Sequence, residues 1–365
     1  MGEGSLRKAV VLCAGEGTRL RPLTFSRPKH LLPVAGRPLL GWALQALAEA
    51  GIDEVGLVVG HRPEAIQRYV GDGAAWGLEV TYLTQPKPLG LAHAVDSARD
   101  FIGSDDFLLY LGDNLLEGGV APLAEFFAAR RPAAALFVKA VADPRAFGVV
   151  VTEGERVRSL LEKPQNPPSN LAIVGAYAFS QAIMTAIRET PPSARGEYEI
   201  TDAIQRLVST GQEVLALPVQ GFWEDAGRPA ELLLANRLYL DRMQPALLGD
   251  LDARCTVEGV VRIGRGTRAV NCHLLGPCLI GENCVLRDST IGPYVSIDAG
   301  TSVSESRVEN CIIQQDCQIQ HLHGGLTDSV LGVQVEVIGP ESGSGVGGDS
   351  PLRLLLGDMS SIRAF

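Results

Sequence analysis

The sequence predicts an α/β domain followed by a parallel β-helix, and two observations support this prediction. Over about the first 245 residues, short apolar strand-like segments alternate with helical patterns, which is typical of a mainly parallel sheet. Near residue 250 the helical periodicity ends, and aliphatic residues recur at steps of five or six, which is typical of a β-helix. We therefore predict an α/β domain over 1–245, a β-helix domain over 250–338, and a flexible linker with a C-terminal tail over 339–365.

In the α/β part, the predicted strands cover 9–12, 55–59, 107–111 and 134–140, and the predicted helices cover 39–50, 63–70, 120–130, 199–209 and 229–242. Such alternation gives a sheet that helices cover on both faces. Ligands of these sheets bind beyond the carboxyl ends of the strands. The glycine-containing loop after 9–12 and Asp113, after 107–111, stand at such ends and are candidate site residues.

In the β-helix part, an aliphatic residue alternates with a small residue two positions before it. The aliphatic positions are Ile280, Leu286, Ile291, Ile297, Val303, Val308, Ile313 and Ile319, and the small ones are Cys278, Cys284, Ser289, Val295, Thr301, Ser306, Cys311 and Cys317. This pattern resembles hexapeptide β-helices, whose coils are left-handed and triangular and whose two columns face inward. Five of the seven cysteines, including Cys272, take small inward positions, so we expect buried reduced thiols. Their spacings lack the C-x2-C pairs of common zinc sites, which argues against a zinc site at these cysteines.

The composition excludes several classes of function. No apolar run approaches the roughly 20 residues that a membrane span needs, and no apolar segment of a signal peptide precedes the first strand. We therefore expect a cytoplasmic protein with no membrane partner. The net charge of −10 argues against nucleic-acid binding. An anionic substrate would have to be bound by local cations or by a metal ion.

The segment from Cys13 to Val34 reads CAGEGTRLRPLTFSRPKHLLPV and is the most informative part of the chain. Gly15 and Gly17 stand two apart after a strand, where backbone N–H groups can close on phosphate oxygens. Arg19 and Lys29 add the charge that a triphosphate requires. The segment is not a P-loop, because no Gly-Lys-Ser/Thr ends it.

This segment resembles the signature G-x-G-T-R-L-x-P-L-T…P-K-x-L-x-P-V of the sugar-phosphate nucleotidyltransferases, which have a Rossmann-like catalytic domain. The resemblance implies that this chain joins a sugar 1-phosphate to a nucleotide, with release of pyrophosphate. It also implies which residues take part. Ala14, Gly15, Gly17, Thr18 and Arg19 would bind the nucleotide, and Arg19 and Lys29 would act in catalysis.

Two aspartates are predicted to hold Mg²⁺. Asp113 lies in Gly112-Asp113-Asn114, and Asp225 matches the aspartate of the family motif W-x-D-x-G in 223–227. Taken alone, Asp113 would be a turn residue and Asp225 a cap of the following helix. Together they make a metal site credible, and Asp113 also counts as catalytic. Glu224 is not at the aspartate position of this motif, so it is not assigned as a metal ligand.

The stretch QPKPLGLAHA, from Gln85 to Ala94, resembles the base-reading loop of thymidylyl- and uridylyltransferases. The Gln85 amide offers both a donor and an acceptor to the imide edge of thymine or uracil. Gly90 would let the backbone approach the base. We expect His93 to be a helix residue without a catalytic role.

Further family motifs predict the sugar-phosphate site. Phe147-Gly148-Val149, Glu162-Lys163-Pro164 and the stretch RGEYEITD, from Arg195 to Asp202, match them in order. The resemblance assigns Asn114, Gly148, Glu162, Lys163, Val174 and Arg195 to this site. Glu162 would accept hydrogen bonds from sugar hydroxyls. Lys163, which also counts as catalytic, and Arg195 would hold the phosphate.

Within the family, the chain is most similar to the long-form thymidylyltransferases that act on glucose 1-phosphate and carry a C-terminal β-helix. Ala14-Gly15 and Arg27-Pro28-Lys29-His30 depart from their usual pattern and leave dTTP, UTP and GTP open. Two different functions also stay open. The β-helix could be an acetyltransferase with His321 and His323 as bases, or the chain could be a regulatory subunit that senses sugar nucleotides. We expect small-molecule substrates and a homo-oligomer built on the β-helix.

Overall fold

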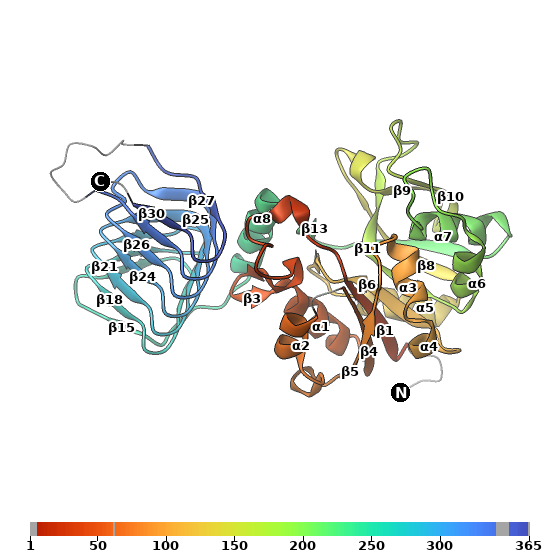
Figure 1. Ribbon diagram of the computed structural model, residues 1–365, viewed down its shortest axis with the longest axis horizontal. Coiled ribbons are helices and arrows are strands. Elements are labelled where there is room, and N and C mark those ends of the chain that lie inside the picture. Colours follow the sequence, from red (N-terminus) through yellow and green to blue (C-terminus); the bar gives the residue numbers. More distant parts are fainter. Residues whose placement is uncertain (1–5, 61–62, 341–349, 364–365) are drawn as a thin grey trace. The chain divides into compact units, whose positions relative to one another are not determined.

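The computed structural model describes residues 6–60, 63–340 and 350–363 (Figure 1). Its contacts define two compact units. Unit 1 comprises the chain up to Gly15 and Leu40–Asp225, and unit 2 comprises Glu16–Leu39 and Ala226 onward. The loop that carries the nucleotidyltransferase signature therefore groups with the C-terminal residues. The boundaries of the three predicted domains stay predictions.

Unit 1 is built on a nine-stranded sheet. Across the sheet the strands are β5 (Glu79–Thr84), β4 (Glu54–Val59), β1 (Lys8–Cys13), β6 (Phe107–Leu111), β11 (Leu171–Phe179), β8 (Ala134–Ala140), β12 (Val214–Pro218), β10 (Arg156–Glu162) and β9 (Gly148–Glu153). Strands β5, β4, β1 and β6 run parallel, as do β8 and β12. Strand β11 is antiparallel to both of its neighbours, and β9 and β10 form an antiparallel pair. All four predicted strands are confirmed.

Helices pack on this sheet (Figure 1), and several of them contribute buried residues to an apolar core. The helices are α1 (Leu39–Glu49), α2 (Glu64–Val70), α3 (Leu91–Asp96), α4 (Arg99–Ile102), α5 (Ala121–Arg130), α6 (Ala182–Glu189) and α7 (Ile200–Ser209). Helix α7 shows why these segments are helical, because Ile200, Ile204 and Leu207 recur on one face and are all buried. The predicted helices of unit 1 are confirmed, with ends that differ by one residue.

A separate two-stranded sheet joins two distant segments of unit 1. Strand β7 (Asn114–Leu116) follows β6 almost directly, and β13 (Trp223–Asp225) pairs with it in antiparallel orientation. This register places Asp225 opposite Asn114 and Trp223 opposite Leu116. The two motifs predicted to supply metal ligands are therefore neighbours in space.

The β-helix of unit 2 is left-handed and has three columns of parallel strands (Figure 1). The first column contains β14 (Ala246–Leu247), β17 (Val261–Ile263), β20 (Cys278–Ile280), β23 (Val295–Ile297) and β29 (Leu355–Leu356). The second contains β15 (Asp250–Leu251), β18 (Arg268–Val270), β21 (Val285–Arg287), β24 (Ser302–Ser304), β26 (Gln318–Gln320), β28 (Glu336–Ile338) and β30 (Ser361–Arg363). The third contains β16 (Thr256–Glu258), β19 (His273–Leu275) and β22 (Thr290–Ile291), and β25 (Arg307–Ile313) and β27 (Leu326–Leu331) span the first and third.

Both predicted inward columns are buried in one core cluster or beside it. Each coil stacks its aliphatic and small residues on those of the previous coil, as Val261, Cys278 and Val295 do. Helix α8 (Pro229–Leu240) packs against β25 and β27 on the outside. The repeat is therefore confirmed residue by residue.

The C-terminal residues return to the β-helix. Strand β29 pairs with β27, and β30 pairs with β28, so the tail adds a further layer to two columns. Most of the predicted flexible linker, 341–349, lies outside the described residues. No helix among the described residues has the length and apolar character required to cross a bilayer.

The inward cysteines should resist chemical modification in the native protein. Burial raises the pKa of Cys278, Cys311 and Cys317 to about 12, and only the thiolate is reactive. We expect a thiol reagent at neutral pH to label the half-buried Cys255 first and to leave these three unmodified until the chain unfolds. Mass spectrometry of the labelled protein checks this. Fast labelling of all three would show that the inward register is wrong.

Candidate active site

The loop after β1 folds back so that Lys29 packs on Gly17. Gly17 has a φ of 65°, and a Cβ at this position would lie 2.9 Å from the Cβ of Lys29. The Thr24 hydroxyl donates to the Gly17 carbonyl oxygen at 2.8 Å. Only glycine fits this conformation and this close approach. Gly15, Thr18 and Arg19 are exposed, whereas Ala14 and Lys29 are half-buried.

Residues of the β-helix and of the C-terminal tail also hold this loop. Arg27 donates from Nη1 to Oε1 of the buried Gln314 at 2.7 Å and from Nη2 to Oδ2 of Asp358 at 2.8 Å. Ser26 also donates to Asp358, at 2.6 Å, and the other carboxylate oxygen of Asp358 accepts from the Val333 amide at 2.8 Å. The C-terminal tail therefore anchors the signature loop within unit 2.

Removing the Asp358 carboxylate should destabilise unit 2. Burial alone would raise the pKa of Asp358, but hydrogen bonds from Ser26, Val333 and Arg27 outweigh burial and lower it. Asp358→Ala would leave a partly buried guanidinium and an amide without this acceptor, so we expect a loss of about 1–3 kcal/mol in the free energy of unfolding. Denaturant unfolding measures it, with the exposed Asp250→Asn as the control.

The pH gives an independent check on Asp358. Because folding lowers the pKa of this carboxyl group, its stabilisation is present above about pH 4 and is lost as the pH falls below that value. The difference in stability between the wild type and Asp358→Ala should therefore shrink in acid. A difference that persists unchanged to pH 2–3, roughly the range below the ordinary carboxyl pKa, would contradict the assigned role.

Asp113 stands at the carboxyl end of β6 and is buried, with 8% of its surface exposed. Asn114 orients it, because the amide Nδ2 of Asn114 donates to Oδ1 of Asp113 at 3.1 Å. Asn114 is itself held by the Trp223 indole N–H at 2.7 Å and the Gly175 amide at 3.2 Å, which both donate to its Oδ1. These three hydrogen bonds of the Asn114 side chain all join it to other protein groups, so we interpret Asn114 as a residue that orients Asp113.

Asp225 lies on β13 directly opposite Asn114. Asp113 is the residue that precedes Asn114. Directly opposite residues of an antiparallel pair have Cβ atoms about 5 Å apart. The interpretation of Asp225 as a helix cap is wrong, because Arg228 takes the N-cap position of α8. Asp113 directly precedes β7 and Asp225 ends β13, and carboxylate oxygens are the hard donors that Mg²⁺ prefers.

Three of the candidate sugar-phosphate residues, Gly148, Lys163 and Arg195, lie around a fourth, Glu162, whereas Asn114 hydrogen-bonds to Asp113 and the Val174 side chain is buried in the core. Glu162 pairs with Gly148 across β9 and β10, and a Cβ on Gly148 would lie 2.9 Å from the Thr201 hydroxyl and 3.3 Å from Oε2 of Glu162. The Thr201 hydroxyl donates to the same Oε2 at 2.7 Å. Gly148 therefore keeps open the space beside this carboxylate.

Two cations and further carboxylates surround Glu162. The Lys163 Nζ lies 3.2 Å and the Arg195 Nη1 lies 3.7 Å from Oε1 of Glu162. Burial, and next the charge of Glu162, raise the pKa of Glu199 and of Asp202. The cluster thus combines carboxylates, which suit hydroxyl groups, with exposed cations, which suit a phosphate. Val174 is fully buried in β11, so its side chain is part of the core.

Gln85 is buried at the end of β5, with 5% of its surface exposed. Its Nε2 donates to the Gly90 carbonyl oxygen at 3.2 Å and lies 3.0 Å from Nδ1 of His93 on α3. When Nδ1 accepts, both amide N–H groups are engaged, and Oε1 is the atom left to meet a ligand. Gly90 has a φ of 111°, and a Cβ there would clash with the backbone of Tyr198 at 2.5 Å.

Sequence reasoning missed the supporting residues of this site. Trp223 orients Asn114, His93 orients Gln85, and Tyr198 accepts from the Ala92 amide at 2.9 Å and donates its own amide to the Leu89 carbonyl oxygen at 2.8 Å. His93 and Tyr198 lie in stretches whose motifs point to their neighbours, and Trp223 is a fixed position of W-x-D-x-G whose supporting role the motif does not reveal. No local pattern distinguishes a support from the residues beside it.

Comparison with known families gives one match that covers most of the chain. A family model described as nucleotidyl transferase matches residues 8–242. This range contains all candidate site residues, from Ala14 to Asp225.

Individual relatives extend the match into the β-helix. The chain is 41% identical over 357 residues to a glucose-1-phosphate thymidylyltransferase of Streptomyces antibioticus, covering 97% of this chain and 99% of the relative. It is 35% identical to a bifunctional protein GlmU of Methanocaldococcus jannaschii, covering 89% of this chain and 77% of the relative. Among solved structures, a UDP-glucose pyrophosphorylase complexed with UDP-glucose matches with a TM-score of 0.60 at 25% identity, covering 65% of this chain and 100% of that chain.

Proposed function

Because the chain belongs to the nucleotidyl transferase family, we propose that it transfers a nucleotidyl group from dTTP, and less well from UTP, to glucose 1-phosphate. The family resemblance predicted from the sequence motifs is confirmed. The observation that carries the proposal is the pairing of β7 with β13, which brings the Asp113 and Asp225 motifs together. The thymidylyltransferase relative, which aligns over nearly the whole chain, supplies the substrate class.

The proposed reaction is a direct displacement. A phosphate oxygen of the sugar 1-phosphate attacks the α-phosphorus of the nucleotide, the new P–O bond forms, and the bond to pyrophosphate breaks. Arg19 and the backbone of Gly15–Thr18 bind the leaving pyrophosphate, and Lys29 steadies the α-phosphate. Lys163 and Arg195 hold the attacking phosphate, while Glu162 accepts from sugar hydroxyls. Alignment and charge stabilisation supply the rate enhancement.

Asp113 and Asp225 would hold Mg²⁺, which neutralises phosphate charge when bound. The chain itself contributes the orientation of these carboxylates. Asn114 donates to Asp113, and Trp223 and Gly175 keep the Asn114 amide in place. These supports hold Asp113 in one orientation in advance of substrate binding, which avoids reorganisation during the reaction.

A substrate panel tests the proposed function. Four nucleoside triphosphates are each combined with glucose 1-phosphate, galactose 1-phosphate, mannose 1-phosphate and N-acetylglucosamine 1-phosphate, and pyrophosphate release is measured. We expect the highest kcat/KM with dTTP and glucose 1-phosphate. A preference for GTP with mannose 1-phosphate would show a guanylyltransferase instead. Failure of every pair to release pyrophosphate would favour a regulatory subunit.

A second activity in the β-helix is a further candidate function. The similarity to a bifunctional relative favours it, and His321 and His323 are the predicted bases of an acetyl transfer. Incubation with acetyl-CoA and amino-sugar phosphates, with free thiol as the readout, tests this activity. Release of free thiol that is lost in His321→Ala would establish the second activity, and release no faster than spontaneous hydrolysis would exclude it for these acceptors.

We also propose that the protein associates through the β-helix and acts in the cytoplasm, where its nucleotide substrates are made. Val257 and Val285 are exposed apolar residues of β-strands in unit 2. Apolar side chains on strand faces favour association. Light scattering at micromolar concentration should therefore give a multiple of the 38.8 kDa chain mass. A monomer would contradict this proposal.

A further inference from the structure

One corner of the β-helix gathers two histidines and a glutamate. Glu305 follows β24 and His321 follows β26, and both have a positive φ, of 46° and 56°. The His321 amide donates to the Ser304 carbonyl oxygen at 3.1 Å, so the two residues occupy the same corner of successive coils. Their side chains are therefore stacked on the outside of the β-helix.

An insertion brings a second histidine to this corner. Ser306 and Val308 are two positions apart, whereas their counterparts in the next coil, Leu322 and Leu326, are four positions apart. The later coil therefore carries two additional residues here, and His323 lies in this insertion. A tight turn closes it, because the Gly325 amide donates to the Leu322 carbonyl oxygen at 3.0 Å.

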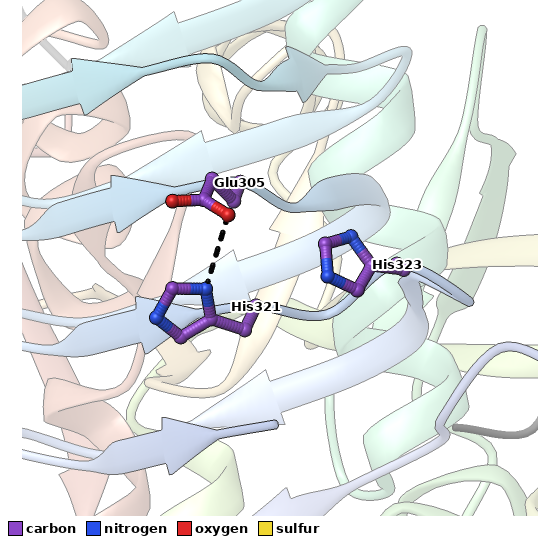
Figure 2. A group of neighbouring side chains, drawn as sticks. All are labelled: Glu305, His321 and His323. Atoms are coloured by element: carbon purple, nitrogen blue, oxygen red, sulfur yellow. Dashed lines mark hydrogen bonds and ion pairs between the residues drawn. The ribbon is translucent and has the colours of Figure 1, made fainter. Parts of the chain in front are cut away.

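The geometry of the three side chains suits a metal ion. Nδ1 of His321 and Oε2 of Glu305 are 3.2 Å apart, and one ligand atom from each residue lies within 4.8 Å of the others (Figure 2). Bonds of about 2.0–2.2 Å to a tetrahedral Zn²⁺ place its ligand atoms roughly 3.3 Å from one another. The Glu305–His321 distance already matches this value, and a small movement of His323 completes the set.

Charge also favours a metal over ion pairing alone. One carboxylate can neutralise one imidazolium, and protonation of both histidines would place two like charges side by side. A divalent cation instead uses the lone pairs of two neutral imidazoles together with the carboxylate. Two nitrogen ligands and one oxygen ligand suit Zn²⁺ better than Mg²⁺ or Ca²⁺, which prefer oxygen.

We propose that Glu305, His321 and His323 bind Zn²⁺ at the outer corner of the β-helix, with water completing the coordination. The ion would join the coil that contains Glu305 to the inserted turn of the next coil. It would therefore cross-link the two coils and stabilise this end of the β-helix. The proposal does not depend on the nucleotidyl transfer reaction, because its test measures metal binding.

Isothermal titration with ZnCl₂ tests the proposal on the full chain, prepared without a polyhistidine tag. Excess Mg²⁺ is present to occupy the Asp113–Asp225 carboxylates. We expect one Zn²⁺ per chain, with an affinity that falls at least about 100-fold in His321→Ala and in His323→Ala, since each removes a ligand. Glu305→Gln should weaken binding by about 10- to 100-fold.

The matched control is His273→Ala. His273 pairs with Glu258 at 3.0 Å on successive coils, as His321 pairs with Glu305, but no third ligand among the described residues lies close enough to complete a set with this pair. This variant should bind Zn²⁺ like the wild type. Equal binding by wild type and His323→Ala, or no binding by the wild type, would overturn the proposal.

Thermal unfolding and optical spectra give two further readouts. Zn²⁺ at a hundredfold excess over its Kd should raise the unfolding temperature by roughly 5 °C in the wild type and His273→Ala, but not in His323→Ala. Co²⁺ at the same site should show visible absorption bands of a four- or five-coordinate ion. Bands that persist unchanged in His321→Ala and His323→Ala would place the ion elsewhere and overturn the proposal.

Discussion

Asp113→Asn and Asp225→Asn should each lower kcat by a factor of about 10²–10⁴, because loss of a metal carboxylate removes several kcal/mol of charge stabilisation. Asparagine keeps the shape of aspartate, and Asn114 can still donate to the remaining side-chain oxygen at position 113. The fold should therefore survive. Initial rates of pyrophosphate release at saturating dTTP and glucose 1-phosphate measure the effect, and circular dichroism checks the fold.

Glu224→Gln is the matched control for this pair. Glu224 neighbours Asp225 on β13, pairs with Leu115, and lies off the family motif. Because Glu224 is not at the motif position that predicts the metal ligand, its substitution should change kcat by less than about threefold. The dependence of rate on Mg²⁺ adds a second readout, because a lost ligand should raise the concentration required for half-maximal rate. Near-normal activity in either aspartate variant would refute the metal assignment.

Gln85→Ala should lower the preference for dTTP over CTP by about 10- to 100-fold in kcat/KM, while kcat with dTTP falls less. A base that leaves a buried polar group unpaired loses about 1–3 kcal/mol for each such group. Gln85 is buried, and its Nε2 is engaged by Gly90 and His93, so its Oε1 would accept from the ring N3–H of thymine or uracil, which cytosine lacks. Thymine and uracil differ by one methyl group, so their discrimination should be weaker.

Two further variants separate base reading from general damage. His93→Ala should change selectivity in the same direction but less than Gln85→Ala, because the Gln85 amide loses only one of its two partners. Gln67→Ala, at an exposed position of α2, should leave selectivity unchanged. Efficient use of CTP by the wild type would overturn this account of Gln85.

The parts of the structure that the sequence predicted are those with local signals. The strand Phe107–Leu111 is a continuous apolar run, and the inward columns repeat every five or six residues, so burial alone determines their place. Similarly, Gly17 marks a left-handed position that other residues rarely adopt. Patterns of this kind act over a few residues and need no knowledge of the remaining chain.

Features that depend on long-range register could not be predicted. Strand β11 is an apolar run like the parallel strands β1 and β6, and nothing in Leu171–Phe179 encodes its antiparallel direction. The position of Asp225 opposite Asn114 depends on pairing across more than one hundred residues. The contact of Arg27 with Asp358 joins residues 331 positions apart. Each of these is decided by tertiary packing, which overrides local preference.

The anchoring of Arg27 by Gln314 and Asp358 bears on how such proteins can be recombined. A gene truncated after the family-matched segment, 8–242, would still encode the whole nucleotidyl transferase motif set but would delete both partners of this arginine. Exchange of β-helices between relatives would succeed only when the incoming module supplies an acidic residue and an amide at equivalent places. The family-matched segment and the β-helix should therefore be inherited together. In a library of chimaeras, the folded members should be those whose crossover points retain the Arg27 partners.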